Sequence, residues 1–142
     1  MSDSDLIKLY SQRILALTTD IAHLGRLPDP KASATRRAPL CGSTVTVDLR
    51  VINGTVTDFA QEVQACALGQ ASAALLGAVV IGRNRAELAK ARDQLEAMLK
   101  TDAAPPDAPF EGYEVLIAAR DYPNRHASIL LPLDATLDAL AR

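Results

Sequence analysis

The sequence predicts an α+β domain in which a small antiparallel sheet of three strands is covered on one face by four to six helices. Ala and Leu dominate while aromatic residues make up only 4% of the chain, and this balance favours helices over an all-β design. A segment of alternating polarity followed by Asn53-Gly54 predicts a β-hairpin. The length of 142 residues suits one domain, which we expect to span residues 1–142.

A helix is expected in the first segment, where apolar residues recur at steps of three and four. These residues form one stripe of a helix: Ile7, Tyr10, Ile14, Leu17, Ile21 and Leu24. Asp3 or Ser4 can cap its start, and Gly25 fits its end. Prolines at positions 28 and 30 prevent its continuation, and residues 31–40 are expected to form a loop that leads to Cys41.

The hairpin and the later helices follow from local patterns. Val45, Val47, Leu49 and Val51 alternate with polar residues, which predicts a half-buried strand. Residues 55–65 are expected to form the return strand, with Asp48 and Glu62 as exposed partners on the sheet face. Helices are then expected over residues 68–81, after the capping box of residues 84–87, over residues 112–120 and from Pro123 onward, with a kink or break at Pro132.

Charge and hydropathy exclude several classes of protein. The net charge of −2 and the pI of about 5.6 argue against a general nucleic-acid binder. The N-terminus has acidic residues where a signal peptide needs basic ones, so we expect a cytoplasmic protein. The longest uncharged run, residues 65–82, is too weakly hydrophobic for a membrane span, and we expect no membrane association.

Three side chains are candidate metal ligands, Cys41, Cys66 and His126, and each lies at a junction between expected elements. Cys66 precedes a helix without charged side chains, whose N-terminal dipole favours the thiolate that binds metals. Arg36 and Arg37 would add positive potential near Cys41. The alternative is a purely structural role, in which each cysteine is a small buried apolar residue and His126 is a packed imidazole. In a reducing compartment the two cysteines are expected to be free thiols or ligands rather than a disulfide.

Three ordered motifs resemble those of the NifU/IscU family of iron–sulfur cluster assembly scaffolds. The first is Ala38-Pro39-Leu40-Cys41-Gly42-Ser43, similar to a proline shortly before Cys-Gly-Asp. The second is Cys66 with the small-residue, serine-containing start of the next helix. The third is Arg125-His126-Ala127-Ser128, similar to His-Cys or Lys-Cys followed by Ser. The resemblance covers nearly the whole chain and departs from the family at Ala127, in place of the third cysteine, and at Ser43, in place of the aspartate.

The resemblance implies a scaffold and not an enzyme. Cys41, Cys66 and His126 would converge, partly exposed, at one end of the sheet and hold iron, a 2Fe–2S cluster or zinc. The implied partners are a cysteine desulfurase and acceptor apo-proteins. With three protein ligands at most, the site would need a fourth from water, from a carboxylate such as Asp121, or from the second copy in a homodimer. Two alternatives remain: an interaction module that regulates the desulfurase without building clusters, and a thiol enzyme that uses Cys66 with His126 as base.

Overall fold

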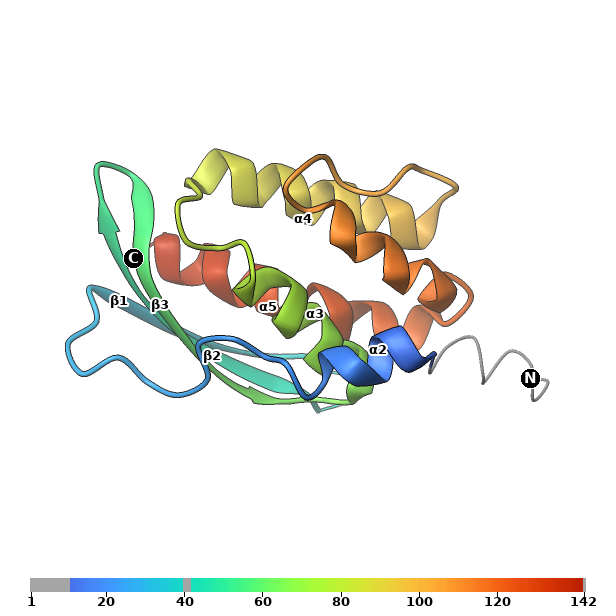
Figure 1. Ribbon diagram of the computed structural model, residues 1–142, viewed down its shortest axis with the longest axis horizontal. Coiled ribbons are helices and arrows are strands. Elements are labelled where there is room, and N and C mark those ends of the chain that lie inside the picture. Colours follow the sequence, from blue (N-terminus) through green and yellow to red (C-terminus); the bar gives the residue numbers. More distant parts are fainter. Residues whose placement is uncertain (1–10, 40–41, 142) are drawn as a thin grey trace.

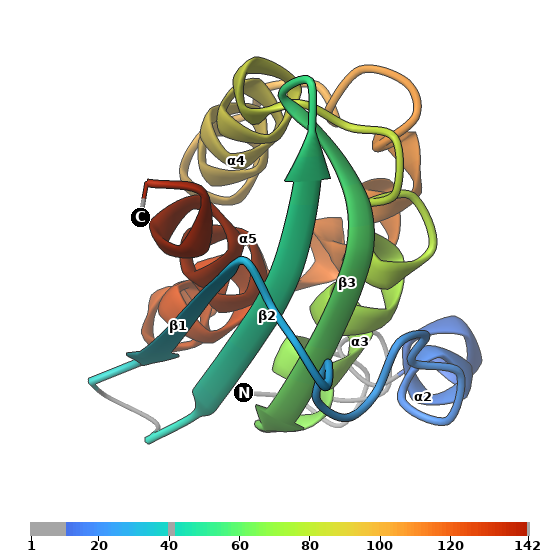
Figure 2. The same ribbon diagram turned by 90° about the vertical axis from the view of Figure 1, so that its left-hand side faces the viewer.

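The computed structural model describes residues 11–39 and 42–141 and contains an antiparallel sheet backed by helices (Figures 1 and 2). The strands are β1 (Ala32–Arg37), β2 (Thr44–Ile52) and β3 (Thr55–Gln64), in the order β1-β2-β3. The helices are α2 (Gln12–Leu17), α3 (Ala67–Gly77), α4 (Arg85–Lys100) and α5 (His126–Leu140), with 3-10 helices η1 (Glu111–Ala119) and η2 (Pro123–Arg125). Helices pack behind the sheet in Figure 2, so the expected α+β architecture is confirmed.

The third strand is formed by a segment that we expected to be a loop. Residues 32–37 pair antiparallel with β2, with Ala34 opposite Val47 and Arg37 opposite Thr44. The expectation was wrong because this segment lacks a strong alternation of polarity: Ala34 is its one fully buried residue, and the next three are exposed. Residues 32–37 form a strand because they pair with β2, whose alternation of polarity is strong, and not because of their own sequence. Residues 38–43 consequently connect two paired strands.

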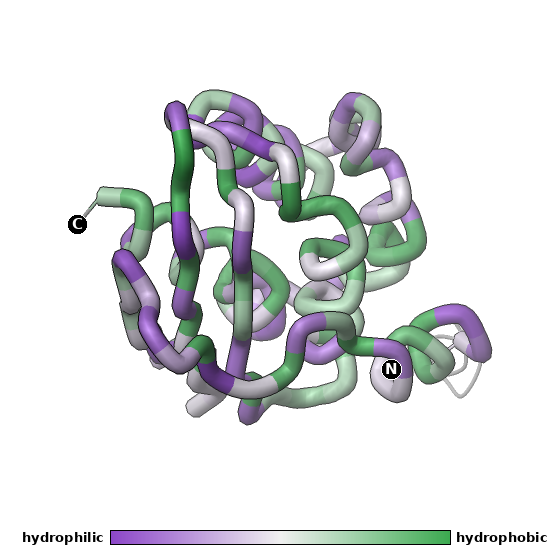
Figure 3. Tube along the Cα trace, turned by 60° about the vertical axis from the view of Figure 1, so that its left-hand side comes forward, coloured by the Kyte–Doolittle hydropathy of each residue, from purple (hydrophilic) through white to green (hydrophobic). Residues whose placement is uncertain are grey.

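The β2–β3 hairpin turns where the sequence predicts. Asn53 and Gly54 both have positive φ, 52° and 78°, as a two-residue turn of this kind requires. A shift of register between Arg50 and Val51 lets the hairpin twist at this end. Hydrophilic and hydrophobic residues alternate along the strands, as Figure 3 shows. The apolar face, with Val45, Val47 and Leu49 at most 1% exposed, packs against the helices.

The first described helix is shorter than its apolar stripe. α2 begins after Ser11, whose side chain accepts a hydrogen bond from the N–H of Ile14, and it ends at Leu17. The hydroxyls of Thr18 and Thr19 donate to carbonyls of the last turn, which competes with continuation. The expected end at Gly25 was therefore wrong, and the expected caps at Asp3 and Ser4 lie outside the described residues.

The chain after α2 lies along the edge of β3. Leu24 forms a parallel bridge with Gln61, whose N–H donates to the carbonyl of His23 and whose carbonyl accepts from the N–H of Gly25. The Gln61 side chain, fully buried, donates to the carbonyls of Ala22 and Ala73. Residues 22–25 are thus extended because they pair with the sheet, although their spacing also fits the helical stripe.

The segment that follows crosses the outer face of the sheet (Figure 2) and is held there by Asp48. This carboxylate is 0% exposed and accepts hydrogen bonds from Arg26 at 2.6 and 3.0 Å, from Ser33 at 2.6 Å and from the N–H of Leu27 at 3.0 Å. Burial raises the pKa of Asp48, but these bonds more than offset burial and hold the pKa below its usual range. The expected exposed pairing with Glu62 was wrong, because Asp48 lies opposite Ala60.

The helices follow the predicted order with two differences. α3 begins at Ala67 but ends at Gly77 rather than near Ile81, while α4 has the complete capping box of Asn84 and Glu87. α5 runs through Pro132 without being divided. Since Pro132 has no N–H, the carbonyl of Ser128, four residues earlier, lacks its usual helical donor. No helix in the described ranges is both long and apolar enough to span a bilayer.

Candidate functional site

Cys66 occupies the junction between β3 and α3, as the sequence predicts. It is the N-cap residue of α3, with extended backbone angles of −65° and 170°, and its side chain does not bond the helix it precedes. Its carbonyl accepts the N–H of Gln70 at 2.9 Å and so starts the helix. The thiol is free and half-buried. It is therefore available to groups that approach from α5.

Two serine hydroxyls meet beside this thiol. The Cys66 Sγ atom lies 3.5 Å from Oγ of Ser128, and Ser128 Oγ lies 3.0 Å from Oγ of Ser43. Ser128 is 0% exposed and Ser43 is 3% exposed. Three polar side chains from the start of α3, the start of α5 and the approach to β2 are thus in contact at one place. The motif around His126 contained Ser128, but its sequence gave no reason to place this residue against Cys66.

A glycine and a second serine bring α3 and α5 together at this point. A Cβ atom on Gly69 would lie 2.6 Å from Oγ of Ser128, so only glycine allows the observed approach. One turn later, the Ser72 hydroxyl donates to the carbonyl of Ile129 at 2.5 Å. Cys66 is the N-cap of α3 and Ser128 is the third residue of α5, so the N-terminal ends of both helices adjoin the Cys66 thiol.

Cys41 lies outside the described residues, but the two ends of the connection that contains it, residues 38–39 and 42–43, are described. Ala38 donates its N–H to the carbonyl of Ser43 at 2.8 Å, and Gly42 donates to the carbonyl of Ala38 at 3.0 Å. These bonds close the β1–β2 connection that contains Cys41. Because Ser43 touches Ser128, the same connection reaches the group next to Cys66.

The two arginines expected near Cys41 have different surroundings. Arg36 forms an ion pair with Asp138 of α5 at 3.0 Å, which balances its charge. A terminal nitrogen of Arg37 lies 3.7 Å from the place that a Cβ of Gly42 would occupy, so this guanidinium is beside the β1–β2 connection. Their effect on the potential at Cys41 stays a prediction.

His126 is placed differently from the expectation of a partly exposed ligand. It is 4% exposed, and its Nε2 atom lies 2.9 Å from the carbonyl oxygen of Ala119 in η1. A carbonyl can only accept, so Nε2 donates its proton in this bond. His126 and Asp121 both line an open hollow of about 440 Å³ at the end of α4. Its role as a ligand beside Cys41 and Cys66 stays a prediction.

The described residues contain no preformed metal-binding site. Within residues 11–39 and 42–141, no three His, Cys, Asp or Glu side chains lie close enough together to hold a metal ion. Of the two predicted ligands in these ranges, Cys66 is in the group with Ser43 and Ser128, whereas His126 is hydrogen-bonded to Ala119. The described donor set, one thiol with two hydroxyls, fits a soft metal through its single sulfur atom, and the part of Cys41 in it stays a prediction.

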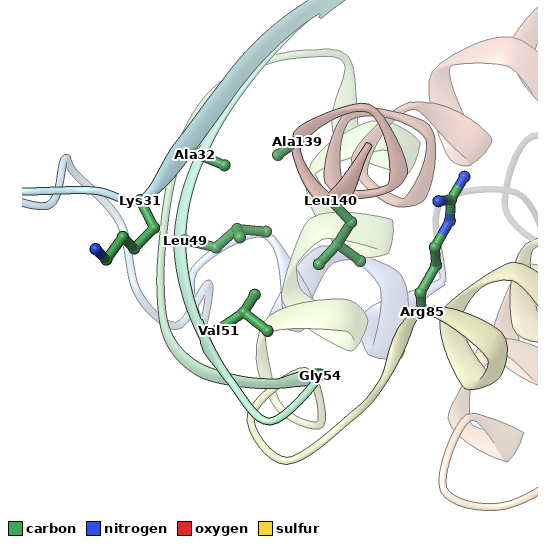
Figure 4. A pocket seen from close by; sticks show the side chains of 8 residues that line it. All are labelled: Lys31, Ala32, Leu49, Val51, Gly54, Arg85, Ala139 and Leu140. Carbon is green, nitrogen blue, oxygen red and sulfur yellow. The ribbon is translucent and has the colours of Figure 1, made fainter. Parts of the chain in front are cut away.

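A separate hollow of about 310 Å³ lies at the far end of α5 (Figure 4). Leu49, Val51 and Leu140 project into it, while Lys31 and Arg85 lie on its two sides with their charged ends directed outward. Leu140 ends α5, whereas Ser128 is in its first turn, so this hollow is remote from Cys66. The described residues that line it include no thiol, imidazole or carboxylate.

Comparison with known proteins relates this arrangement to one family. The family model described as "NifU-like N terminal domain" matches residues 9–128, which includes Cys41, Cys66 and His126. The iron-sulfur cluster assembly scaffold protein IscU of Thermotoga maritima is 25% identical over 134 residues, covering 94% of each chain.

Solved structures agree with this relationship. The N-terminal part of a nitrogen-fixing NifU-like protein from Brucella abortus is 44% identical, with a TM-score of 0.93, and the match covers 96% of this chain and 95% of that one. A SUF-system scaffold protein from Fervidobacterium islandicum, 22% identical with a TM-score of 0.80 over 94% and 98% of the two chains, shares the fold. The chain therefore belongs to the family of NifU-like N-terminal domains.

Proposed function

We propose that this protein is a scaffold for iron–sulfur cluster assembly, on which iron and sulfide are held as cargo by Cys41 and Cys66. Membership of the NifU-like family supports this function. The single observation that carries it is the position of Cys66, a free thiol at the start of α3 beside the first turn of α5. Thiolate sulfur is the preferred ligand of iron in such clusters and also binds zinc.

The proposed site offers few protein ligands, and this suits a cargo that must leave. Ala127 cannot ligate, and the hydroxyl of Ser43 is a poorer ligand than a carboxylate. Cys41, Cys66 and His126 would supply three donors at most, leaving one position for water, sulfide, Asp121 or a second copy of the chain. A bound 2Fe–2S cluster would accordingly be labile, and release to an acceptor would be easy.

The partners we propose are a cysteine desulfurase as the source of sulfur and apo-proteins as acceptors. The relatives named as assembly scaffolds support this expectation. We further propose that the protein acts in the cytoplasm and does not turn over a substrate as an enzyme. Neither nucleic acid nor a membrane is needed for this role.

Anaerobic reconstitution with ferrous iron and sulfide tests the function. We expect a chromophore in the visible range on the unmodified protein, lost in Cys41→Ser and in Cys66→Ser and kept in Thr19→Ala, an exposed control in the turn after α2. Circular dichroism would verify that each variant is folded. A chromophore that persists when both cysteines are replaced, or that never forms on the unmodified protein, would refute the proposal.

The second candidate is an interaction module that binds the desulfurase without building clusters. Ala127 and Ser43, which stand where the family has a cysteine and an aspartate, favour it. In this case the Cys41→Ser/Cys66→Ser double variant would bind and inhibit a desulfurase as well as the unmodified protein does. A thiol enzyme has less support, because Cys66 contacts the hydroxyl of Ser128 and Nε2 of His126 contacts a carbonyl.

A further inference from the structure

The hydroxyl of Ser128 lies between two other polar side chains, 3.5 Å from the sulfur of Cys66 and 3.0 Å from the oxygen of Ser43. We propose that Ser128 is a positioning residue that donates a hydrogen bond to the Cys66 thiolate and accepts one from Ser43. For the cluster-bound state this inference depends on the proposed function. For the free thiolate it does not.

Proton counting sets the direction of the two bonds. A thiolate has no proton, so it can only accept, and the single proton of Ser128 must then point at the sulfur. The lone pairs of Ser128 are left to accept from the hydroxyl of Ser43. When Cys66 is a neutral thiol, either sulfur or oxygen can donate, and the bond is weaker. The serine pair therefore interacts more strongly with the charged form of Cys66 than with the neutral form.

Packing fixes the hydroxyl in this place. Ser128 is fully buried and Ser43 nearly so, so bulk water does not reach the two hydroxyls. Gly69 lies where any side chain would collide with the Ser128 hydroxyl, and Ser72 holds the next turn of α5. A hydrogen-bond donor held in place beforehand stabilises charge without paying for reorganisation when the charge forms.

The serine pair also changes the chemistry of the site relative to one with a carboxylate. A carboxylate would add negative charge next to the thiolates, whereas two hydroxyls add none and donate a proton toward sulfur. Hydrogen bonds to a ligating sulfur raise the reduction potential of an iron–sulfur cluster. Ser128 would thus act through Cys66 and need not touch the metal.

Alkylation of the metal-free protein tests the inference. Iodoacetamide labelling of Cys66 is followed by peptide mass spectrometry in the full chain at neutral pH. We expect Ser128→Ala to slow labelling about fivefold, as the loss of one hydrogen bond to the sulfur would. Ser128→Thr should restore the rate because it keeps the hydroxyl, and Thr19→Ala should change nothing.

Ser43→Ala gives a second test that leaves Ser128 in place. It should slow labelling by a smaller factor, about twofold, because it removes the outer bond and leaves the bond from Ser128 to Cys66 in place. If Ser128→Ala does not fold, Ser43→Ala and Ser128→Thr decide the matter. Unchanged labelling in a folded Ser128→Ala or Ser43→Ala, or Ser128→Thr as slow as alanine, overturns the inference.

The cluster supplies a readout that separates this inference from the proposed function. On the reconstituted protein, Ser128→Ala should shift the reduction potential to a more negative value, with Ser128→Thr close to the unmodified protein. If no cluster forms on the unmodified protein but Ser128→Ala slows labelling, the proposed function fails and the role of Ser128 stands. If a cluster forms and Ser128→Ala changes neither labelling nor potential, the function stands and the role of Ser128 is refuted.

Discussion

Gly69 in α3 lies against Ser128 in α5 so closely that a methyl group on the glycine would come within 2.6 Å of the serine hydroxyl and 2.8 Å of the Cβ of Ala65. We predict that Gly69→Ala destabilises the fold by about 1–3 kcal/mol, because two helices must separate to accept the methyl group. Urea unfolding measures this loss. Labelling of Cys66 should also slow, since Ser128 is displaced from the thiol.

Gly112→Ala is the matched control for this prediction. A Cβ there would meet only the end of the Leu75 side chain, at 3.3 Å, and a flexible leucine can adjust. Its cost should be below about 1 kcal/mol. Equal unfolding midpoints for the two variants would show that the approach of α3 to α5 is looser than described.

Asp48 should make stability dependent on acid pH. Its pKa is lower in the folded protein than in the unfolded chain, so the carboxylate stabilises the fold above about pH 5. As the pH falls through the unfolded value near 4 and then through the lower folded value, this contribution is lost. We predict that Asp48→Asn costs about 1–3 kcal/mol at pH 7, and that the difference from the unmodified protein narrows toward pH 3.

Urea unfolding at pH 7, 5 and 3 would measure this dependence, with the exposed Asp20→Asn as control. Asp20→Asn should leave the profile unchanged. A gap between Asp48→Asn and the unmodified protein that stays constant with pH would contradict the assignment to this carboxylate.

Restoring the missing cysteine should stabilise bound cargo. Ala127 is half-buried and immediately precedes Ser128, so Ala127→Cys places a thiol next to the Cys66 site. We predict a higher yield of reconstituted cluster and slower transfer to a chelator, by about tenfold, because another thiolate replaces a labile ligand. Absorption in the visible range follows both.

Ala16→Cys, on the exposed side of α2, controls for the mere presence of a third thiol. It should behave like the unmodified protein. An equal gain in both variants would mean that the added sulfur captures iron without regard to its position.

His126→Gln separates a ligand from a packed side chain. Glutamine can donate a proton to the carbonyl of Ala119 in place of Nε2, but its amide is a poor ligand for zinc or iron. We predict an unfolding free energy within about 1 kcal/mol of the unmodified protein and a zinc affinity at least about tenfold lower. Competition with a coloured chelator measures the affinity. A folded variant with unchanged affinity would limit His126 to its bond with Ala119.

Local patterns predicted those parts of the fold that short-range physics determines. The turn at Asn53-Gly54 and the capping box at Asn84 depend on a few adjacent residues, and both formed as expected. β1 could not be predicted, because its order comes from pairing with β2. Residues 22–25 fit a helical stripe, yet they pair with the edge of β3. Their sequence is compatible with both a helix and an extended segment, and it does not show which of the two forms.

The sequence predicted where the candidate site residues stand relative to the strands and helices, but not which side chains they contact. Cys66 stands at the predicted junction and is a free thiol. The depth of His126 and the contact of Ser128 with Cys66 depend on how α5 crosses α3, which Gly69 decides from 59 residues away. The spacing of residues along the chain does not predict how two helices cross.

The bridge between Leu24 and Gln61 has a consequence for self-association. It occupies backbone groups on the outer edge of β3. An extended peptide that adds a strand to the sheet would therefore pair with the edge of β1. That edge ends in Arg36 and Arg37, and such charges act as gatekeepers against strand-to-strand aggregation. Neutralising them should make the protein prone to form fibrils through β1, while the far side of the sheet stays protected by its own chain.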